Sequence, residues 1–114
     1  VGVPPEIMGI GPVKSTHTAL SRAGISIDDL DVIELNEAFS AQSIAVLKEL
    51  ELEYDDSRLN IDGGALSIGH PLGASGARIL GKAATLLNRV DGEYALASMC
   101  IGGGMGIATI LRRL

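Results

Sequence analysis

The chain has 114 residues, of which 46% are hydrophobic and 20% are charged, a balance that suits one packed domain and argues against disorder. The formal net charge is −5 and no basic cluster stands out, so nucleic acid is not an expected partner. A single cysteine excludes an internal disulfide and fits a reducing, cytoplasmic setting. No apolar run approaches the ~20 residues of a membrane span, so no membrane partner is expected.

The first half of the chain predicts two helices around a strand. Pro12 just inside the start and Gly24 just past the end delimit a helix over 12–23. Ser26 with Asp29 forms a small capping box for one helical turn. DVIEL (31–35) is short, partly β-branched and bounded by polar residues, which predicts a buried strand. Apolar spacing predicts a second helix over 38–52, and RLNID (58–62) is a candidate for another short strand.

The second half opens with the glycine-rich stretch GGALSIGHPLGASGAR (63–78), which leads into a long helix that ends near Val90. EYALASM (93–99) and MGIATIL (105–111) are apolar strand candidates that a glycine loop joins as an antiparallel hairpin. The alternation of helices and strands predicts an α/β fold, with helices layered on a mixed sheet that ends in this antiparallel strand pair.

Three polar side chains stand where chemistry usually takes place, at the ends of strands or in loops that follow them. Asn36 comes directly after the strand 31–35, His70 precedes the long helix, and Cys100 follows the strand 93–99. A parallel arrangement would gather them at one edge of the sheet. There the imidazole can exchange a proton near neutral pH, the thiol can act as acid–base or nucleophile, and the amide can orient or donate.

Each of these residues also has a purely structural interpretation. Free cysteine is among the most buried residue types, so Cys100 also fits a small hydrophobe before a turn. Asn36 fits an Asx-turn or helix N-cap, and His70 fits a structural role. His17 is expected to be an exposed helix residue without function, and Glu37 is favoured as a structural anchor over a general base. The glycine runs lack the lysine of a P-loop and the third glycine of a dinucleotide fingerprint, and the cysteine and histidines are too scattered for zinc.

NEAF (36–39), GGALSIGHPLGASGAR (63–78) and SMCIGGGMG (98–106), in this order, resemble the C-terminal half of thiolases, the acetyl-CoA acetyltransferases and 3-ketoacyl-CoA thiolases. EIMGIGP (6–12) resembles the segment that opens this half, so the similarity covers nearly the whole chain. The resemblance implies that residues 1–114 are a thiolase C-terminal domain. It implies an acyltransferase of fatty acid metabolism that makes or cleaves 3-ketoacyl-CoA by Claisen condensation or thiolysis, with coenzyme A as substrate and no other cofactor or metal.

The resemblance also implies a role for each matching position. His70 matches the histidine that activates the nucleophilic cysteine and helps to hold the thioester oxygen, and Asn36 matches the asparagine that fixes a water in this first oxyanion hole. Cys100 matches the acid–base cysteine. Gly102 matches the glycine whose backbone N–H contributes to a second oxyanion hole, and glycine there gives access and the unusual φ that the turn needs. Residues that match the lining of the acyl and pantetheine pocket are Met8, Ala38 and Phe39.

The sequence departs from the family pattern at its start. The nucleophilic cysteine of the family belongs to the N-terminal half, and the loop that grips the CoA nucleotide lies between the halves; neither is found here. The chain begins without methionine, and Val1–Val3 match only the tail of the first strand of the half, so this strand is expected to be largely missing. The resemblance implies a sheet order of 3-2-1-4-5, in which this strand is central, so its loss would leave unpaired edges and a gap.

We therefore expect the catalytic domain of a longer enzyme, with the N-terminal thiolase half as partner, inactive by itself and a homo-oligomer at full length. One alternative is a non-catalytic thiolase-like binding or assembly module. A ketoacyl synthase-like enzyme that uses carrier-protein substrates is disfavoured by the NEAF and GHP motifs. Acyl chain length and the direction of the reaction are not predicted by these residues.

Overall fold

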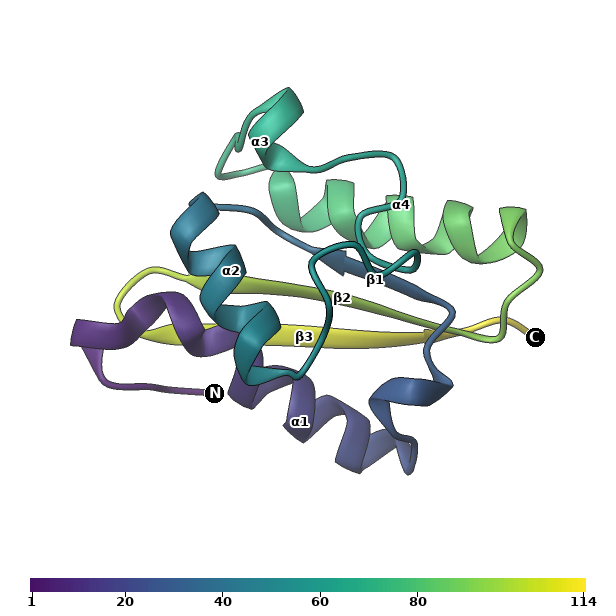
Figure 1. The fold of residues 1–114 in the computed structure, drawn as a ribbon, viewed down its shortest axis with the longest axis horizontal. Coiled ribbons are helices and arrows are strands. Elements are labelled where there is room, and N and C mark those ends of the chain that lie inside the picture. The colour runs from purple at the N-terminus through teal and green to yellow at the C-terminus, as the bar shows by residue number, and fades with distance from the viewer.

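A mixed three-stranded sheet runs through the middle of the computed structural model, which describes residues 1–114 (Figure 1). Strand β1 (Val32–Leu35) pairs in parallel with β2 (Tyr94–Ile101), and β2 pairs antiparallel with β3 (Met105–Arg112). The order β1-β2-β3 therefore combines one parallel pair with the predicted hairpin.

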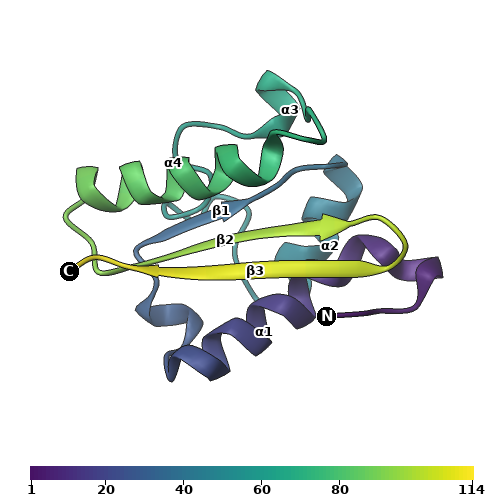
Figure 2. The same ribbon diagram turned by 180° about the vertical axis from the view of Figure 1, so that it is seen from behind.

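Helices cover both faces of this sheet. Helix α1 (Gly11–Ala23) and helix α2 (Ser40–Glu49) lie on one face, and α4 (Ser75–Arg89) lies on the other, as the view from behind also shows (Figure 2). Three short helices complete the fold, namely η1 (Pro5–Ile10), η2 (Ile27–Asp29) and α3 (Ala65–Ile68). The structure confirms the α/β class with helices layered on a mixed sheet. None of its helices combines the length and apolar character needed to cross a membrane.

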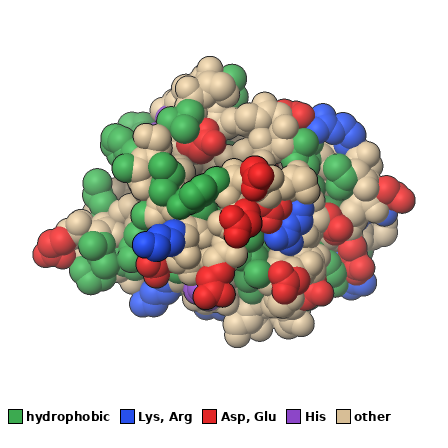
Figure 3. Space-filling model, viewed as in Figure 1, with side chains coloured by type: hydrophobic (Ala, Val, Ile, Leu, Met, Phe, Trp, Pro, Cys, Tyr) green, Lys and Arg blue, Asp and Glu red, His purple; other side chains and the backbone are tan.

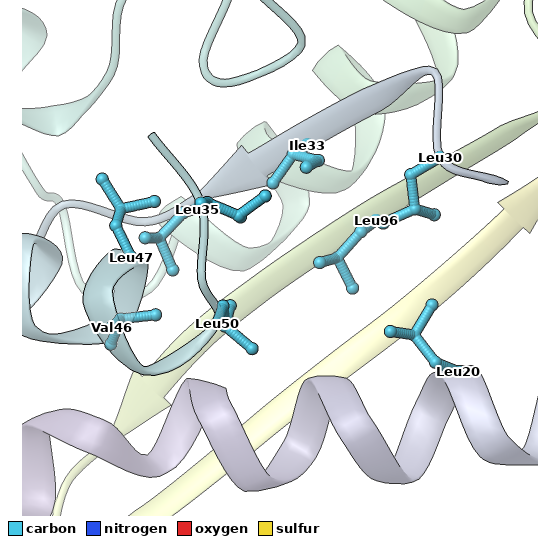
Figure 4. Close-up of a cluster of buried hydrophobic side chains, with 9 residues drawn as sticks. Leu20, Leu30, Ile33, Leu35, Val46, Leu47, Leu50 and Leu96 are labelled. Carbon is cyan, nitrogen blue, oxygen red and sulfur yellow. The ribbon is translucent and has the colours of Figure 1, made fainter. Parts of the chain in front are cut away.

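Alternate residues of the strands supply two hydrophobic cores, because successive side chains of a strand point to opposite faces. Ile33, Leu35 and Leu96 pack toward α1 and α2 in the larger core (Figure 4). Val32 and Ala95 pack toward α4 in the other core. All four residues of β1 are buried, as expected for a parallel strand covered on both faces.

The predicted helix over 12–23 is confirmed within one residue. Pro12 lies in the first turn of α1, and Gly24 ends the helix in the left-handed region at φ 72°. The start of α1 also lies very close to β3, since a Cβ added to Gly106 would overlap the backbone of Gly11. This close approach fixes the position of η1, which directly precedes α1 and carries Met8.

Other boundaries differ from the predictions. Helix α2 is shorter than 38–52, because Phe39 remains extended (φ −144°, ψ 144°) and the helix ends at Glu49. The segment 58–62 forms only an isolated bridge between Leu59 and Ile33. In place of a strand ladder, the Asn60 side chain accepts from the Leu35 N–H and donates to the Leu35 carbonyl, both at 2.9 Å.

The expected position of the first strand is wrong. β1 and β2 are direct neighbours, with Val32 opposite Ala95, so no strand is missing between them. Val1–Val3 instead run along the outer edge of β3, where Gly2 forms an isolated antiparallel bridge with Met105. The Gly106 N–H donates to the Val1 carbonyl at 3.1 Å. The strand pattern of a sequence does not encode which strands are neighbours, and the assumed order therefore placed a gap where none exists.

Candidate active site

The predicted polar residues Asn36 and Cys100 lie at the same edge of the sheet, as the parallel pairing of β1 and β2 requires. The backbone N–H of Asn36 donates to the Ser98 carbonyl at 2.9 Å and so extends the pairing by one residue beyond β1. Cys100 lies within β2 rather than after it, opposite Gly106 of β3. The loop between α3 and α4 brings His70 to this edge, within 3.5 Å of Asn36.

A cavity of about 420 Å³ opens at this edge. Its walls contain six of the seven site residues that the sequence predicts, namely Met8, Ala38, Phe39, His70, Cys100 and Gly102. The seventh, Asn36, is only 1% exposed and lies against His70. The lining residues that sequence reasoning missed are Gly9, Leu72, Met99 and Ile101.

The rim of the cavity is apolar and open. Phe39 is 66% exposed and Leu72 is 83% exposed, so large hydrophobic side chains face solvent beside the polar groups. Figure 3 shows hydrophobic side chains gathered at this end of the molecule, where η1, α2 and α3 lie. An apolar wall with few polar groups is typical of a cavity that binds an organic ligand.

His70 is held by two polar neighbours. Its Nδ1 lies 2.6 Å from Oγ of Ser75, and Nδ2 of Asn36 lies 3.5 Å from each ring nitrogen. Helix α4 begins at Ser75, so His70 precedes the helix by five residues. Sequence reasoning gave Ser75 no role of its own, and its place in the motif GGALSIGHPLGASGAR (63–78) was the one available signal.

The amide of Asn36 also contacts α4. Its Oδ1 accepts from Nη2 of Arg78 at 3.3 Å, one helical turn beyond Ser75. Two residues before Asn36, Glu34 of β1 is 2% exposed and forms an ion pair with Lys82 at 3.2 Å. Burial raises the pKa of the Glu34 carboxyl above its ordinary value, and the charges of Lys82 and Arg78 oppose this shift. Charged side chains of α4 therefore lie directly beside the strand that carries Asn36.

Cys100 is partly buried. Burial raises the pKa of its thiol, against the smaller effect of a backbone hydrogen bond. The thiol is therefore protonated at neutral pH. A protonated thiol at the wall of an apolar cavity can donate a proton to a reacting carbon, and its thiolate can remove one.

Two features were expected of Gly102, open access and an unusual φ, and the structure places them at different glycines of the turn. The left-handed backbone of the turn is at Gly103 (φ 76°) and Gly104 (φ 83°), not at Gly102. A Cβ added to Gly102 would meet no atom within 4 Å. Glycine at 102 therefore leaves open space in the cavity, and the expected unusual φ belongs to its two successors.

Glu37 acts as an anchor. Its Oε2 accepts from the Leu66 N–H at 2.9 Å and its Oε1 accepts from Nδ2 of Asn60 at 3.1 Å, which ties the α3 segment to the end of β1. His17 is exposed on α1, outside this cavity. No group of three or more His, Cys, Asp or Glu side chains is arranged to hold a metal ion.

Comparison with known proteins identifies the family. The model of the thiolase C-terminal domain matches residues 1–113. A 3-oxoadipyl-CoA/3-oxo-5,6-dehydrosuberyl-CoA thiolase from Escherichia coli K12 is 57% identical over 113 residues, and the beta-ketothiolase BktB from Cupriavidus necator is 58% identical over 113 residues. Each alignment covers 99% of this chain and 28% of the relative.

The solved structures agree. Human mitochondrial 3-ketoacyl-CoA thiolase superposes with a TM-score of 0.94 at 49% identity, over 98% of this chain and 28% of that one. The chain therefore belongs to the thiolase family and has the fold of its C-terminal domain. It spans a little over a quarter of the length of the thiolases that it matches.

Proposed function

We propose that this chain is the C-terminal catalytic domain of an acyl-CoA:acetyl-CoA C-acyltransferase and supplies the acid–base side of its active site. The observation that carries the proposal is a cavity of about 420 Å³ that is lined by His70, Cys100 and Gly102, with Asn36 beside His70. Coenzyme A thioesters are its substrates, and no further cofactor takes part.

Cys100 exchanges the proton on the α-carbon. In condensation the Cys100 thiol first protonates the CoA sulfur that leaves when the nucleophilic cysteine of the N-terminal half is acylated. The Cys100 thiolate then removes a proton from the methyl group of acetyl-CoA, and the carbanion attacks the carbonyl of the bound acyl group. The new C–C bond forms as the C–S bond breaks. In cleavage the same steps run backward, and the Cys100 thiol protonates the departing enolate. The raised pKa of Cys100 supports this role, because the protonated thiol is the form that cleavage requires.

The other residues stabilise charge and move the second proton. His70 accepts the thiol proton of the nucleophilic cysteine when the cysteine sulfur attacks a thioester. It returns the proton to this cysteine when the cysteine sulfur leaves the acyl group. His70, with a water held by Asn36, donates to one thioester oxygen, and the N–H of Gly102 contributes to the site of the other. Met8, Ala38 and Phe39 form apolar walls that suit the acyl and pantetheine chains.

The remaining parts of the site come from outside these residues. The single cysteine of this chain has the acid–base role, so the nucleophile belongs to an N-terminal half, and the full-length enzyme is a cytoplasmic homo-oligomer. We expect no thiolase turnover from the 114 residues by themselves.

Proton exchange tests the proposal. In D₂O, a full-length thiolase that carries this sequence as its C-terminal domain exchanges the methyl protons of acetyl-CoA for deuterium, which ¹H NMR follows directly. Cys100→Ala removes this exchange, and His17→Asn, on the exposed side of α1, serves as the control that keeps it. Exchange that persists in Cys100→Ala contradicts the assigned role and favours the alternative of a non-catalytic binding module.

A further inference from the structure

Ser75 is the closest polar neighbour of the His70 ring, and nothing so far assigns it a function. It is the first residue of α4, is fully buried at 0% exposed, and places Oγ 2.6 Å from Nδ1 of His70. The only other contact of this hydroxyl is the Pro71 carbonyl, at the longer distance of 3.2 Å.

The Pro71 carbonyl has its full number of hydrogen bonds without the Ser75 hydroxyl. The Pro71 carbonyl already accepts the backbone N–H groups of Ala74 at 2.8 Å and of Ser75 at 2.9 Å. A carbonyl oxygen has two lone pairs, so both are used. The Ser75 hydroxyl is therefore available to the imidazole, and the shorter distance to Nδ1 agrees with this.

A hydroxyl can both donate and accept a hydrogen bond, and it rotates to suit its partner. It donates to Nδ1 when this nitrogen is bare and accepts from Nδ1 when this nitrogen carries a proton. The contact between Ser75 and Nδ1 therefore persists in every protonation state of the ring. A histidine held through one nitrogen uses the other for chemistry, because the partner of one nitrogen determines the role of its neighbour.

We propose that Ser75 is a positioning residue that keeps Nδ1 of His70 occupied, so that Nε2 is the nitrogen that exchanges a proton with the nucleophilic thiol. The catalytic part of this inference rests on the proposed function. The part that concerns the ring, that Ser75 holds Nδ1, can be measured without catalysis.

The chain offers a matched control for the loss of the hydroxyl. Ser43 in the first turn of α2 is 8% exposed, and its hydroxyl donates to the carbonyl four residues earlier, Phe39, at 3.1 Å. Ser75 has the same arrangement with Pro71. Ser43→Ala therefore removes a comparable helix contact without touching His70.

Kinetics of the full-length thiolase that carries this sequence give the first readout. In Ser75→Ala, we expect kcat to fall roughly 10- to 100-fold because Nδ1 loses its buried partner, while KM for the acyl-CoA stays within about twofold. The acidic limb of the pH profile of kcat also moves, which a merely structural role would not cause. Ser75→Thr keeps a hydroxyl and recovers part of the rate. A Ser75→Ala enzyme with the kcat and pH profile of Ser43→Ala overturns the proposal.

The imidazole signals of the same full-length thiolase, labelled with ¹⁵N, give the second readout. Long-range ¹H–¹⁵N correlation spectra report the protonation of each ring nitrogen, and the signals that are lost in His70→Asn are those of His70. We expect Ser75→Ala to shift the Nδ1 and Nε2 signals of His70, and Ser43→Ala to leave them in place. Unchanged signals in Ser75→Ala overturn the proposal. If Ser75→Ala shifts these signals but the full-length wild type has no thiolase activity, the proposed function is refuted and the hold of Ser75 on Nδ1 is supported.

Discussion

Arg78 of α4 donates from Nη2 to Oδ1 of Asn36 across 3.3 Å. Because the guanidinium has only donors, the amide oxygen must face it, and the amide NH₂ must therefore point away toward His70. The orientation of an amide buried to 1% exposure is thus determined by a side chain one turn along the helix from Ser75.

Arg78→Met is expected to leave the Asn36 amide without a fixed orientation. The variant keeps the aliphatic stem but loses the charge-assisted hydrogen bond, which is worth roughly 1.5–3 kcal/mol when one partner is ionised. We expect kcat of the full-length thiolase to fall about tenfold or more. Arg89→Met, on the same helix but in an exposed ion pair with Asp62, is the control. Equal activity of the two variants would show that Arg78 does not orient Asn36.

Cys100 is expected to react slowly with alkylating agents at neutral pH. Its raised pKa leaves less thiolate than a free cysteine has, and the thiolate is the reactive form. Mass spectrometry of the chain after timed exposure to iodoacetamide should show a lower rate at pH 7 than for the same chain in denaturant. The rate of the folded chain should continue to rise above pH 9, where the rate of the denatured chain levels off, because folding raises the pKa above its ordinary value of 9.0. A faster reaction in the folded chain at pH 7 would contradict this environment for the thiol.

Two glycine substitutions should separate function from stability. Gly102→Ala adds a methyl group to open space and should change the free energy of unfolding by less than about 0.5 kcal/mol. It should still slow the thiolase, because the methyl group enters the cavity beside the N–H. Gly106→Ala overlaps the backbone of Gly11 and should cost roughly 1–3 kcal/mol or more. Urea unfolding measures both, and similar destabilisation by the two would refute this distinction.

Glu34 should make stability depend on pH in a defined direction. The pKa of this carboxyl is raised by folding, so its contribution to stability is fully present below its ordinary value of 4.5 and is lost as the pH rises through the folded-state pKa. The free energy of unfolding of the wild type, relative to Glu34→Gln, should therefore fall between pH 4 and pH 7. Urea midpoints across this range provide the test. Glu49→Gln, an exposed helix carboxylate, is the control for the loss of one charge. A relative stability that rises with pH would contradict burial as the dominant effect.

Much of the fold could be predicted from local signals. Pro12 and Gly24 mark the two ends of α1 because their backbone preferences act within the helix itself. The meeting of Asn36 and Cys100 at one edge follows from two strands that run in parallel. These features depend on short-range chemistry or on a single topological rule.

The rest depended on contacts between distant segments. The order of the strands was mispredicted because it was taken from the resemblance, and the pairing of Gly2 with Met105 leaves no mark on the alternation of apolar residues that could have corrected it. The segment 58–62 failed to form a strand because the Asn60 side chain satisfies the Leu35 backbone instead. Ser75 and Arg78 appeared in the sequence only as helix residues, since their partners lie on other segments of the chain.

The most direct test of the account is a chimera of BktB, the relative that is 58% identical over 113 residues, in which this chain replaces the matching C-terminal segment. Thiolysis of acetoacetyl-CoA is followed by the loss of its absorbance. We expect the chimera to be active, and Cys100→Ala and His70→Ala in it each to lose activity by a factor of roughly 10² to 10⁴. A folded chimera that is inactive, or one whose activity survives both substitutions, would contradict the claim that this domain supplies the acid–base residues.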